Sequence, residues 1–199
     1  MLLSFEVSWS FGINMPFQFK VIVFIVASLG LVLVSPSSLR AFRSHGFYRF
    51  LAWEAILALL LLNLVYWFHE PFSIHQIVSW LLLISSLLLA IHGFILLRMV
   101  GKPDSKRHDP SLVGIEKTTE LVTVGAYRYI RHPLYSSLLF GTWGVFFKHP
   151  SWLGVSLAVV TVLFLTMTAK TEEAENIRFF GAAYQSYMNQ TKMFIPFLY

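Results

Sequence analysis

The sequence predicts an all-α integral membrane protein with about five transmembrane helices, of which the last two form a tight helical hairpin. Two observations on composition lead to this prediction: 56% of the 199 residues are hydrophobic, and only 13% are charged. Soluble globular domains carry about 25% charged residues, so this chain lacks the polar surface that water requires. The third observation is the grouping of the apolar residues into long stretches.

Five apolar stretches cover residues 17–34, 50–68, 77–100, 134–147 and 152–169. A helix needs ~20 apolar residues to cross a bilayer, and the first three stretches come close to or exceed this length. The fourth is shorter than a hydrocarbon core of ~30 Å requires at ~1.5 Å per residue. We therefore expect it to begin earlier, to thin the bilayer, or to be buried among its neighbours.

Only residues 148–151 connect the fourth and fifth stretches, and Pro150 lies among them. So short a turn joins antiparallel neighbours, and proline is suited to ending one helix or beginning the next. We therefore expect the fourth and fifth helices to pack together. The chain divides into an N-terminal three-span membrane region, residues 1–100, and a C-terminal region, residues 101–199, which holds the long polar segment 101–131.

The basic residues predict the orientation. Of the 15 Lys and Arg residues, all but Lys20 and Lys148 follow the first, third or fifth stretch. Because basic loops stay on the cytoplasmic side, we expect an extracytoplasmic N-terminus and a cytoplasmic C-terminus. The net charge of +5 is then explained by anionic lipid, and we expect no nucleic-acid partner. The chain has no cysteine, which excludes a thiolate nucleophile.

Two polar clusters flank the hairpin, residues 125–135 before it and residues 171–176 after it. An antiparallel hairpin brings both to one membrane face, where ionisable side chains are costly and usually have a function. Pro133 favours a helix start, which places His132 at the helix entrance. On a helix that continues past residue 169, Glu172, Glu175 and Asn176 share one face. We therefore expect one polar pocket on the cytoplasmic side.

Two further segments adjoin this pocket. Residues 120–125 are β-branched in part and end in glycine, which predicts an extended segment that leads into the first cluster. Residues 179–195 predict a short amphipathic helix with an apolar return that covers the pocket. No metal-ligand spacing links His69, His75, His92 and His149, so we interpret them as structural and predict no metal site.

The order of these motifs resembles one enzyme family. Arg131-His132-Pro133-Leu134-Tyr135, a hairpin, Glu172-Glu173 and then the sequence FFGAAYQSY at 179–187 are similar to the isoprenylcysteine carboxyl methyltransferase family, over roughly the last 80 residues. The Arg-His-Pro-x-Tyr string also occurs in related membrane phospholipid methyltransferases and in sterol reductases. The spacing from the paired glutamates to the FFGxxYxxY pattern favours the methyltransferase.

This resemblance implies that S-adenosyl-L-methionine is the cofactor and that the pocket binds it. The residues implied to hold the cofactor are Glu120, Leu121, Val122, Tyr127, His132, Pro133, Leu134, Tyr135 and Glu172. A nucleotide-binding glycine fingerprint is not found, as expected for a cofactor pocket embedded among membrane helices.

The resemblance also favours methylation of the carboxylate of a lipid-like, prenylcysteine-type acceptor, which enters from the bilayer. The family's prenylcysteine enzymes carry an Arg one helical turn before the cofactor glutamate, where this chain has Thr168. Arg131, Lys170 or Arg178 would have to replace it. We predict Arg131, Glu172 and Lys170 as the catalytic residues.

Three other functions fit parts of the pattern. A phospholipid amine N-methyltransferase would use the same cofactor, and a nicotinamide-dependent, sterol-type reductase shares the Arg-His-Pro-x-Tyr string. A non-catalytic membrane scaffold would need no pocket: His132 would cap a helix, and Glu172 and Glu173 would end a span in water. The oligomeric state does not follow from the sequence.

Overall fold

The computed structural model describes residues 16–34, 42–103 and 118–197. Its helices are α1 (Phe17–Val34), α3 (His45–Asn63), α4 (Ile74–Met99), α5 (Pro133–Phe146), α6 (Trp152–Phe180) and α7 (Ala182–Gln190), with 3₁₀ turns η1 (Leu64–Tyr66) and η3 (Gly125–Arg128). Within the described ranges the β pairing is limited to two isolated bridges. The prediction of an all-α fold is therefore confirmed.

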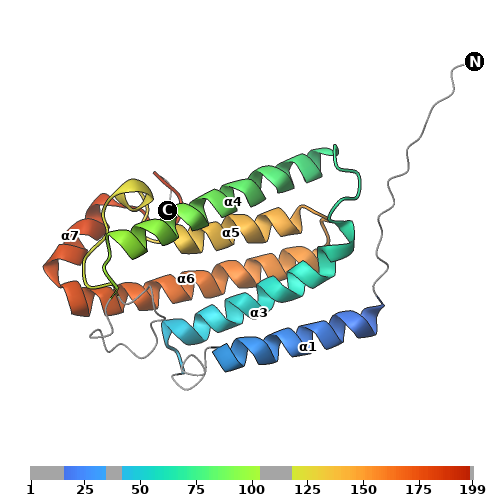
Figure 1. The fold of residues 1–199 in the computed structure, drawn as a ribbon, viewed down its shortest axis with the longest axis horizontal. Helices are drawn as coiled ribbons and strands as arrows, with labels where there is room; N and C mark the ends of the chain where they lie inside the picture. Colours follow the sequence, from blue (N-terminus) through green and yellow to red (C-terminus); the bar gives the residue numbers. More distant parts are fainter. Residues whose placement is uncertain (1–15, 35–41, 104–117, 198–199) are drawn as a thin grey trace, which may run out of the picture.

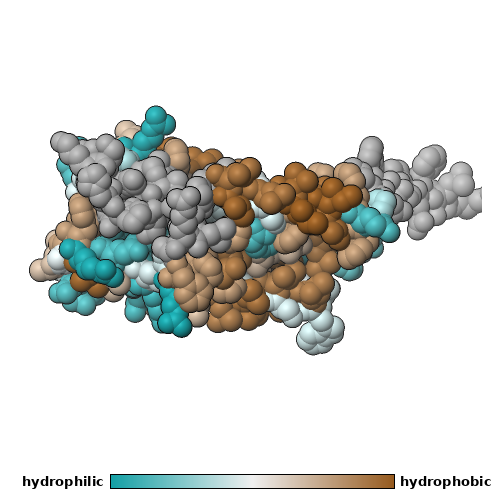
Figure 2. Space-filling view, turned by 90° about the horizontal axis from the view of Figure 1, so that it is seen from below, coloured by the Kyte–Doolittle hydropathy of each residue, from teal (hydrophilic) through white to brown (hydrophobic). Residues whose placement is uncertain are grey.

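The long helices lie side by side in the order α4, α5, α6, α3 and α1 (Figure 1). The short helix α7 and the C-terminal tail lie at one end of this bundle. Hydrophobic residues cover the middle of the molecule, while hydrophilic ones gather at the end that carries α7 (Figure 2). This distribution is that of an integral membrane protein with a polar end.

In the described part of the chain, three segments are long and apolar enough to cross a membrane: His45–Tyr66, Ile74–Met99 and Trp152–Phe180. Helices also form at the first and fourth predicted stretches, but α1 is a shorter apolar helix and α5 has only 14 residues. Five spans therefore stay a prediction. The membrane side of each terminus does too, since the first 15 residues and the basic residues Arg40, Lys106, Arg107 and Lys117 lie outside the described ranges.

The predicted hairpin is present, since α5 and α6 are antiparallel neighbours in contact (Figure 1). Each helix nevertheless packs more extensively against another one, α5 against α4 and α6 against α3. Glycines explain the close approach of α5 to α4. A Cβ atom added at Gly144 would lie 2.8 Å from Leu83, and one at Gly93 would lie 3.1 Å from Leu134. Small residues of this kind let membrane helices approach closely.

The C-terminal end of α5 is buried and is satisfied by its neighbours. Asn63 Nδ2 on α3 donates a hydrogen bond of 2.8 Å to the Val145 carbonyl, and Ser79 Oγ on α4 donates one of 2.7 Å to the Gly144 carbonyl. The last carbonyls of a helix lack partners within it, and lipid offers none. These bonds explain how so short a helix ends inside the bundle, as expected for a stretch buried among its neighbours.

Lys148 lies in the turn after α5 and is only 1% exposed. Its Nζ atom donates a hydrogen bond of 3.0 Å to Gln76 Oε1 and lies 3.4 Å from the centre of the Trp80 ring. Burial lowers the pKa of this amine to about 8. The ring and the amide offset part of the cost of burying the ammonium.

Candidate functional site

A cleft opens at the end of the bundle that carries α7. It measures about 610 Å³ with its open side included. Its walls come from the end of α4, the segment 118–131, the start of α5, the end of α6 and α7. They consist of Leu97, Thr118, Leu121, Val122, Tyr127, Arg131, His132, Leu134, Tyr135, Glu172, Asn176, Phe180, Tyr184 and Tyr187.

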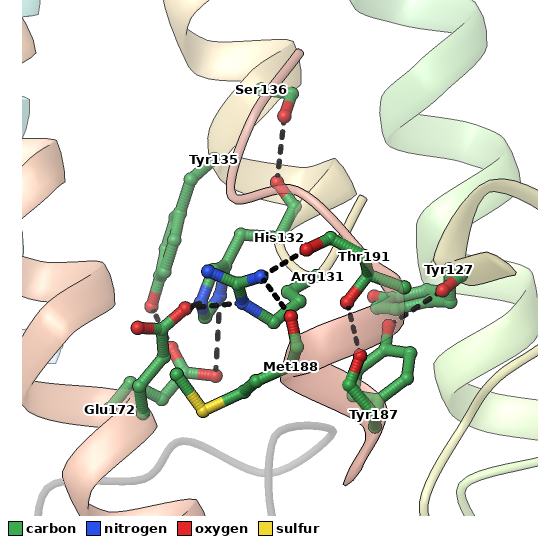
Figure 3. Close-up of polar contacts among 10 residues, drawn as sticks. Tyr127, Arg131, His132, Tyr135, Ser136, Glu172, Tyr187, Met188 and Thr191 are labelled. Atoms are coloured by element: carbon green, nitrogen blue, oxygen red, sulfur yellow. Dashed lines mark hydrogen bonds and ion pairs between the residues drawn. The ribbon is translucent and has the colours of Figure 1, made fainter. Parts of the chain in front are cut away.

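Glu172 contributes a carboxylate to the wall of the cleft. The Tyr135 hydroxyl donates a hydrogen bond of 2.5 Å to Glu172 Oε2, and His132 Nδ1 lies 3.9 Å from Glu172 Oε1. The start of α5 supports both partners, because Pro133 lies in its first turn, as predicted, and His132 is the N-cap residue. The close-up shows Tyr135 pointing toward Glu172 (Figure 3). The first turn of α5 therefore fixes the position of this carboxylate.

The neighbouring carboxylate of Glu173 is buried and serves a different purpose. Arg131 Nε donates a hydrogen bond of 2.6 Å to Glu173 Oε1, and His132 Nε2 lies 3.3 Å from the same oxygen. Arg131 Nη1 also donates to the carbonyls of Met188 at 3.2 Å and Thr191 at 2.5 Å (Figure 3). Arg131 thus joins α6 to the end of α7, so three of its N–H donors are engaged within the protein.

Helix α7 closes one side of the cleft with two buried tyrosines, Tyr184 and Tyr187. The Tyr187 hydroxyl donates a hydrogen bond of 2.7 Å to the carbonyl of Tyr127. Burial raises the pKa of both hydroxyls, and the negative charge of Glu172 raises that of Tyr184 further. Both tyrosines therefore stay neutral hydrogen-bond donors at every physiological pH.

The tail after α7 returns to the start of α5, which agrees with the prediction of a cover. The backbone N–H of His132 donates a hydrogen bond of 3.2 Å to the Met193 carbonyl. The hydroxyl of Ser136 donates one of 2.8 Å to the Phe194 carbonyl. Met193 and Phe194 are both buried. The tail is thus part of the site and not a loose extension.

The turn η3 places Tyr127 in the cleft, and His92 on α4 supports that turn. His92 Nε2 accepts a hydrogen bond of 3.2 Å from the backbone N–H of Ala126. Gly125 has a φ of +59°, and a Cβ atom there would lie 2.6 Å from His92 Nε2. His92 was predicted to be structural, and its ring indeed fixes the turn that carries Tyr127. The segment before it, residues 121–124, forms no regular strand.

Most of the residues predicted for the site line the cleft. These are Leu121, Val122, Tyr127, Arg131, His132, Leu134, Tyr135 and Glu172. Three lie elsewhere: Glu120 is exposed and pairs with Lys102 at 2.7 Å, Pro133 is buried in the first turn of α5, and Lys170 is exposed on α6. Whether the lining residues bind the cofactor stays a prediction.

Six lining residues were not predicted as ligands: Leu97, Thr118, Asn176, Phe180, Tyr184 and Tyr187. The aromatic residues belong to the FFGAAYQSY sequence, which predicted only a covering segment. Asn176 follows Glu172 by one helical turn, which is a usable signal. Leu97 and Thr118 carry no local signal, because their position depends on where α4 ends.

The predicted face of Glu172, Glu175 and Asn176 is divided in the structure. Glu172 and Asn176 line the cleft, whereas Glu175 lies with its Oε2 atom 2.6 Å from His45 Nδ1 on α3. The helical angle explains this difference, since at ~3.6 residues per turn Glu175 and Asn176 point about 100° apart. His45 is fully buried, and one turn later on α3 Arg49 is only 3% exposed. Neither residue was predicted to belong to the site.

The three α6 positions considered for a carboxylate-binding cation, residues 168, 170 and 178, place none in the cleft. Thr168 is buried, and its hydroxyl donates to the Phe164 carbonyl at 2.7 Å. Lys170 and Arg178 are exposed on α6 and do not line the cleft.

A family match covers the segment that forms most of the cleft. The model of the phospholipid methyltransferase family matches residues 74–183, more than half of the chain. The chain belongs to the phospholipid methyltransferase family. The match runs from the start of α4 into α7 and so includes most of the residues that line the cleft. None of the curated proteins matches the chain.

Membership in the phospholipid methyltransferase family agrees with the coarser part of the resemblance. It indicates a membrane methyltransferase, and methyltransferases of this family typically use S-adenosylmethionine. It does not confirm the narrower isoprenylcysteine carboxyl methyltransferase assignment.

Proposed function

We propose that this phospholipid methyltransferase family member transfers a methyl group from S-adenosylmethionine to a lipid acceptor, and that the cleft binds the cofactor. The observation that supports this proposal is Glu172: a carboxylate oriented by Tyr135 at 2.5 Å, in a cleft formed by the matched segment. When bound, S-adenosylmethionine supplies an electrophilic methyl group on a positively charged sulfur.

The donor set of the cleft fits this cofactor. No side chain caps the first turn of α5, and the N–H groups and partial positive charge of such a turn suit the carboxylate of a methionyl group. The Glu172 carboxylate suits its ammonium group. The apolar and aromatic side chains of Leu97, Val122 and Phe180 suit an adenine ring. The buried tyrosines of α7 exclude water from this side of the cleft.

For the acceptor, we propose the amine of a phospholipid headgroup. Three of the four positions considered for a carboxylate-binding cation are exposed or uncharged, and Arg131 is engaged with Glu173. An amine headgroup, in contrast, needs no cation in the cleft, and a phospholipid amine acceptor fits the matched family as well. Because alkyl ammonium groups of the lysine type have a pKa of ~10.4, the amine must lose a proton before it attacks. We therefore expect the rate with an amine acceptor to rise with pH.

A carboxylate acceptor of the prenylcysteine type is the second candidate. The spacing from the paired glutamates to the FFGxxYxxY pattern supports it. Its product would be a methyl ester, which mild base hydrolyses, whereas a methylated amine is stable.

Calorimetric binding of S-adenosylmethionine and its demethylated product tests the cofactor site. The experiment uses detergent-solubilised wild type beside Glu172→Ala and His132→Ala, with Glu120→Ala as the matched control outside the cleft. We expect the first two variants to lose binding and the control to keep it. Binding that survives Glu172→Ala would contradict the proposed site, and no binding to wild type would favour the reductase or the scaffold.

A further inference from the structure

A second hollow lies along the helical hairpin, between α5 and α6. Its walls are Ser136, Leu139, Phe140, Trp143, Val162, Thr166, Phe194 and Ile195. The α5 residues recur at the helical spacing of three and four, so they form one face of that helix. From Ser136 to Trp143 this face extends about 10 Å along the axis at ~1.5 Å per residue. We call this hollow the hairpin groove.

The hairpin groove offers no free polar group to a ligand. Its two hydroxyl groups are satisfied within the protein: Ser136 Oγ lies 2.8 Å from the Phe194 carbonyl, and Thr166 Oγ1 donates to the Val162 carbonyl at 2.8 Å. The remaining walls are apolar side chains. A polar ligand would lose its hydration here without compensation, so the groove suits a hydrocarbon chain.

The hairpin groove ends beside the cleft. Phe194 forms the wall at this end, and its ring centre lies 6.2 Å from that of His132, a residue of the cleft. Tyr135, which orients Glu172, belongs to the same buried cluster as Phe194. On α5, Ser136 of the groove directly follows Tyr135 of the cleft. A chain that lies in the groove therefore has its polar end beside the residues that hold Glu172.

We propose that the hairpin groove binds the hydrocarbon chain of the acceptor and thereby places its headgroup at the cleft. This inference rests on the proposed methyltransferase function and adds a site to it. The occupant is an acyl chain of a phospholipid, since the proposed acceptor is a phospholipid amine of the matched family; a prenyl chain, which presents the same chemistry to the groove, is the competing outcome of the test. Because bilayer lipid is as apolar as the groove, the gain lies in positioning the acceptor.

Filling the groove tests this proposal. Thr166→Trp places a large ring in it, and Leu163→Trp, on the same helix but 57% exposed and outside the groove, is the matched control. Methyl transfer is measured with dioleoyl and dibutyryl phosphatidylethanolamine, and with N-acetyl-S-farnesylcysteine and N-acetyl-S-methylcysteine. Calorimetric binding of the demethylated cofactor shows that each variant keeps its cleft.

We expect Thr166→Trp to lower kcat/KM for the long-chain acceptor by about tenfold or more, the range in which a pocket discriminates by size. Its activity on the short-chain partner and its cofactor binding should stay within about twofold of wild type, and Leu163→Trp should behave as wild type throughout. The loss should appear with the phosphatidylethanolamine pair; a loss confined to the farnesylcysteine pair would overturn the phospholipid chain as the occupant.

Equal activity of Thr166→Trp and wild type on the long-chain acceptor would overturn the groove while leaving the methyltransferase proposal intact. An equal loss on long and short acceptors would overturn it too, since the change would then act on the cleft. Failure of the wild type to methylate any of the four acceptors would overturn both proposals.

Discussion

Replacing Arg131 by methionine separates a structural from a catalytic role for this residue. The change removes the 2.6 Å bond to Glu173 and the bonds to the Met188 and Thr191 carbonyls. It leaves the Glu173 side chain, only 8% exposed, without the arginine and with only the His132 ring at 3.3 Å beside it. Breaking a buried ion pair on one side costs ~3–5 kcal/mol. At about 2–4 °C per kcal/mol for chains of this size, the apparent melting temperature should fall by about 6–20 °C.

The assay is thermal unfolding of the detergent-solubilised protein, followed by tryptophan fluorescence. The double variant Arg131→Met/Glu173→Met should recover most of the loss, because replacing a whole buried pair by apolar residues is often neutral or stabilising. Arg178→Met, on the exposed side of α6, is the control and should melt as wild type does. If Arg131→Met melts within about 2 °C of wild type but raises KM for the acceptor by about tenfold or more, the structural argument is wrong and Arg131 binds the acceptor.

Three further predictions concern the cleft and the opposite end of the bundle. Tyr135→Phe should weaken cofactor binding by about tenfold in calorimetry. The lost hydrogen bond to charged Glu172 is worth ~1.5–3 kcal/mol, and part of this free energy orients the carboxylate toward the cofactor. Unchanged binding would contradict this prediction. Gly125→Ala adds a Cβ atom 2.6 Å from the His92 ring, so it should displace the turn that carries Tyr127 and lower cofactor affinity. Gly181→Ala is the control: nothing lies within 4 Å of its added Cβ atom, so it should lower stability alone. The pKa of Lys148 is about 8 in the folded protein and ~10.4 in the unfolded chain, so the unfolded chain binds more protons between these pH values. The melting temperature should therefore rise from pH 8 to about 10. Lys148→Met should abolish the part of this rise that the lysine causes.

The positions of the long helices were predictable because each overlaps a long apolar stretch of the sequence. The bounds were less predictable at the polar ends. Helix α6 continues to Phe180, although its apolar stretch stops near residue 169. Residues 170–178 contain Lys, Glu and Ala, which are good helix formers, so the helix continues beyond its apolar part. This extension is what brings Glu172, Glu173 and Asn176 to the site.

The site was predictable where a motif lies on one element and less so where elements meet. Pro133 fixes the helix start from local geometry, so His132 and Tyr135 were placed correctly beside Glu172. The partner of Glu175, in contrast, is His45 on another helix, and such a pairing depends on how α3 packs against α6. Lys170 was predicted by proximity in sequence to Glu172, but two helical steps turn its side chain away from the cleft.

The bonds at both ends of α5 decide which parts of the site are able to move during turnover. At one end Asn63 and Ser79 hold its last carbonyls, and at the other Ser136 and the backbone of His132 are bonded to the tail. Helix α5 is therefore held at both ends, and the wall that it contributes to the cleft is rigid. If the cleft binds the cofactor as proposed, exchange of the spent cofactor uses the open side of the cleft or a movement of α7, which would have to break the bonds of Arg131 to Met188 and of Tyr187 to Tyr127. In enzymes whose product leaves past a cover, opening of the cover often limits the rate, so in that second case the bonds that hold α7 would govern the turnover rate.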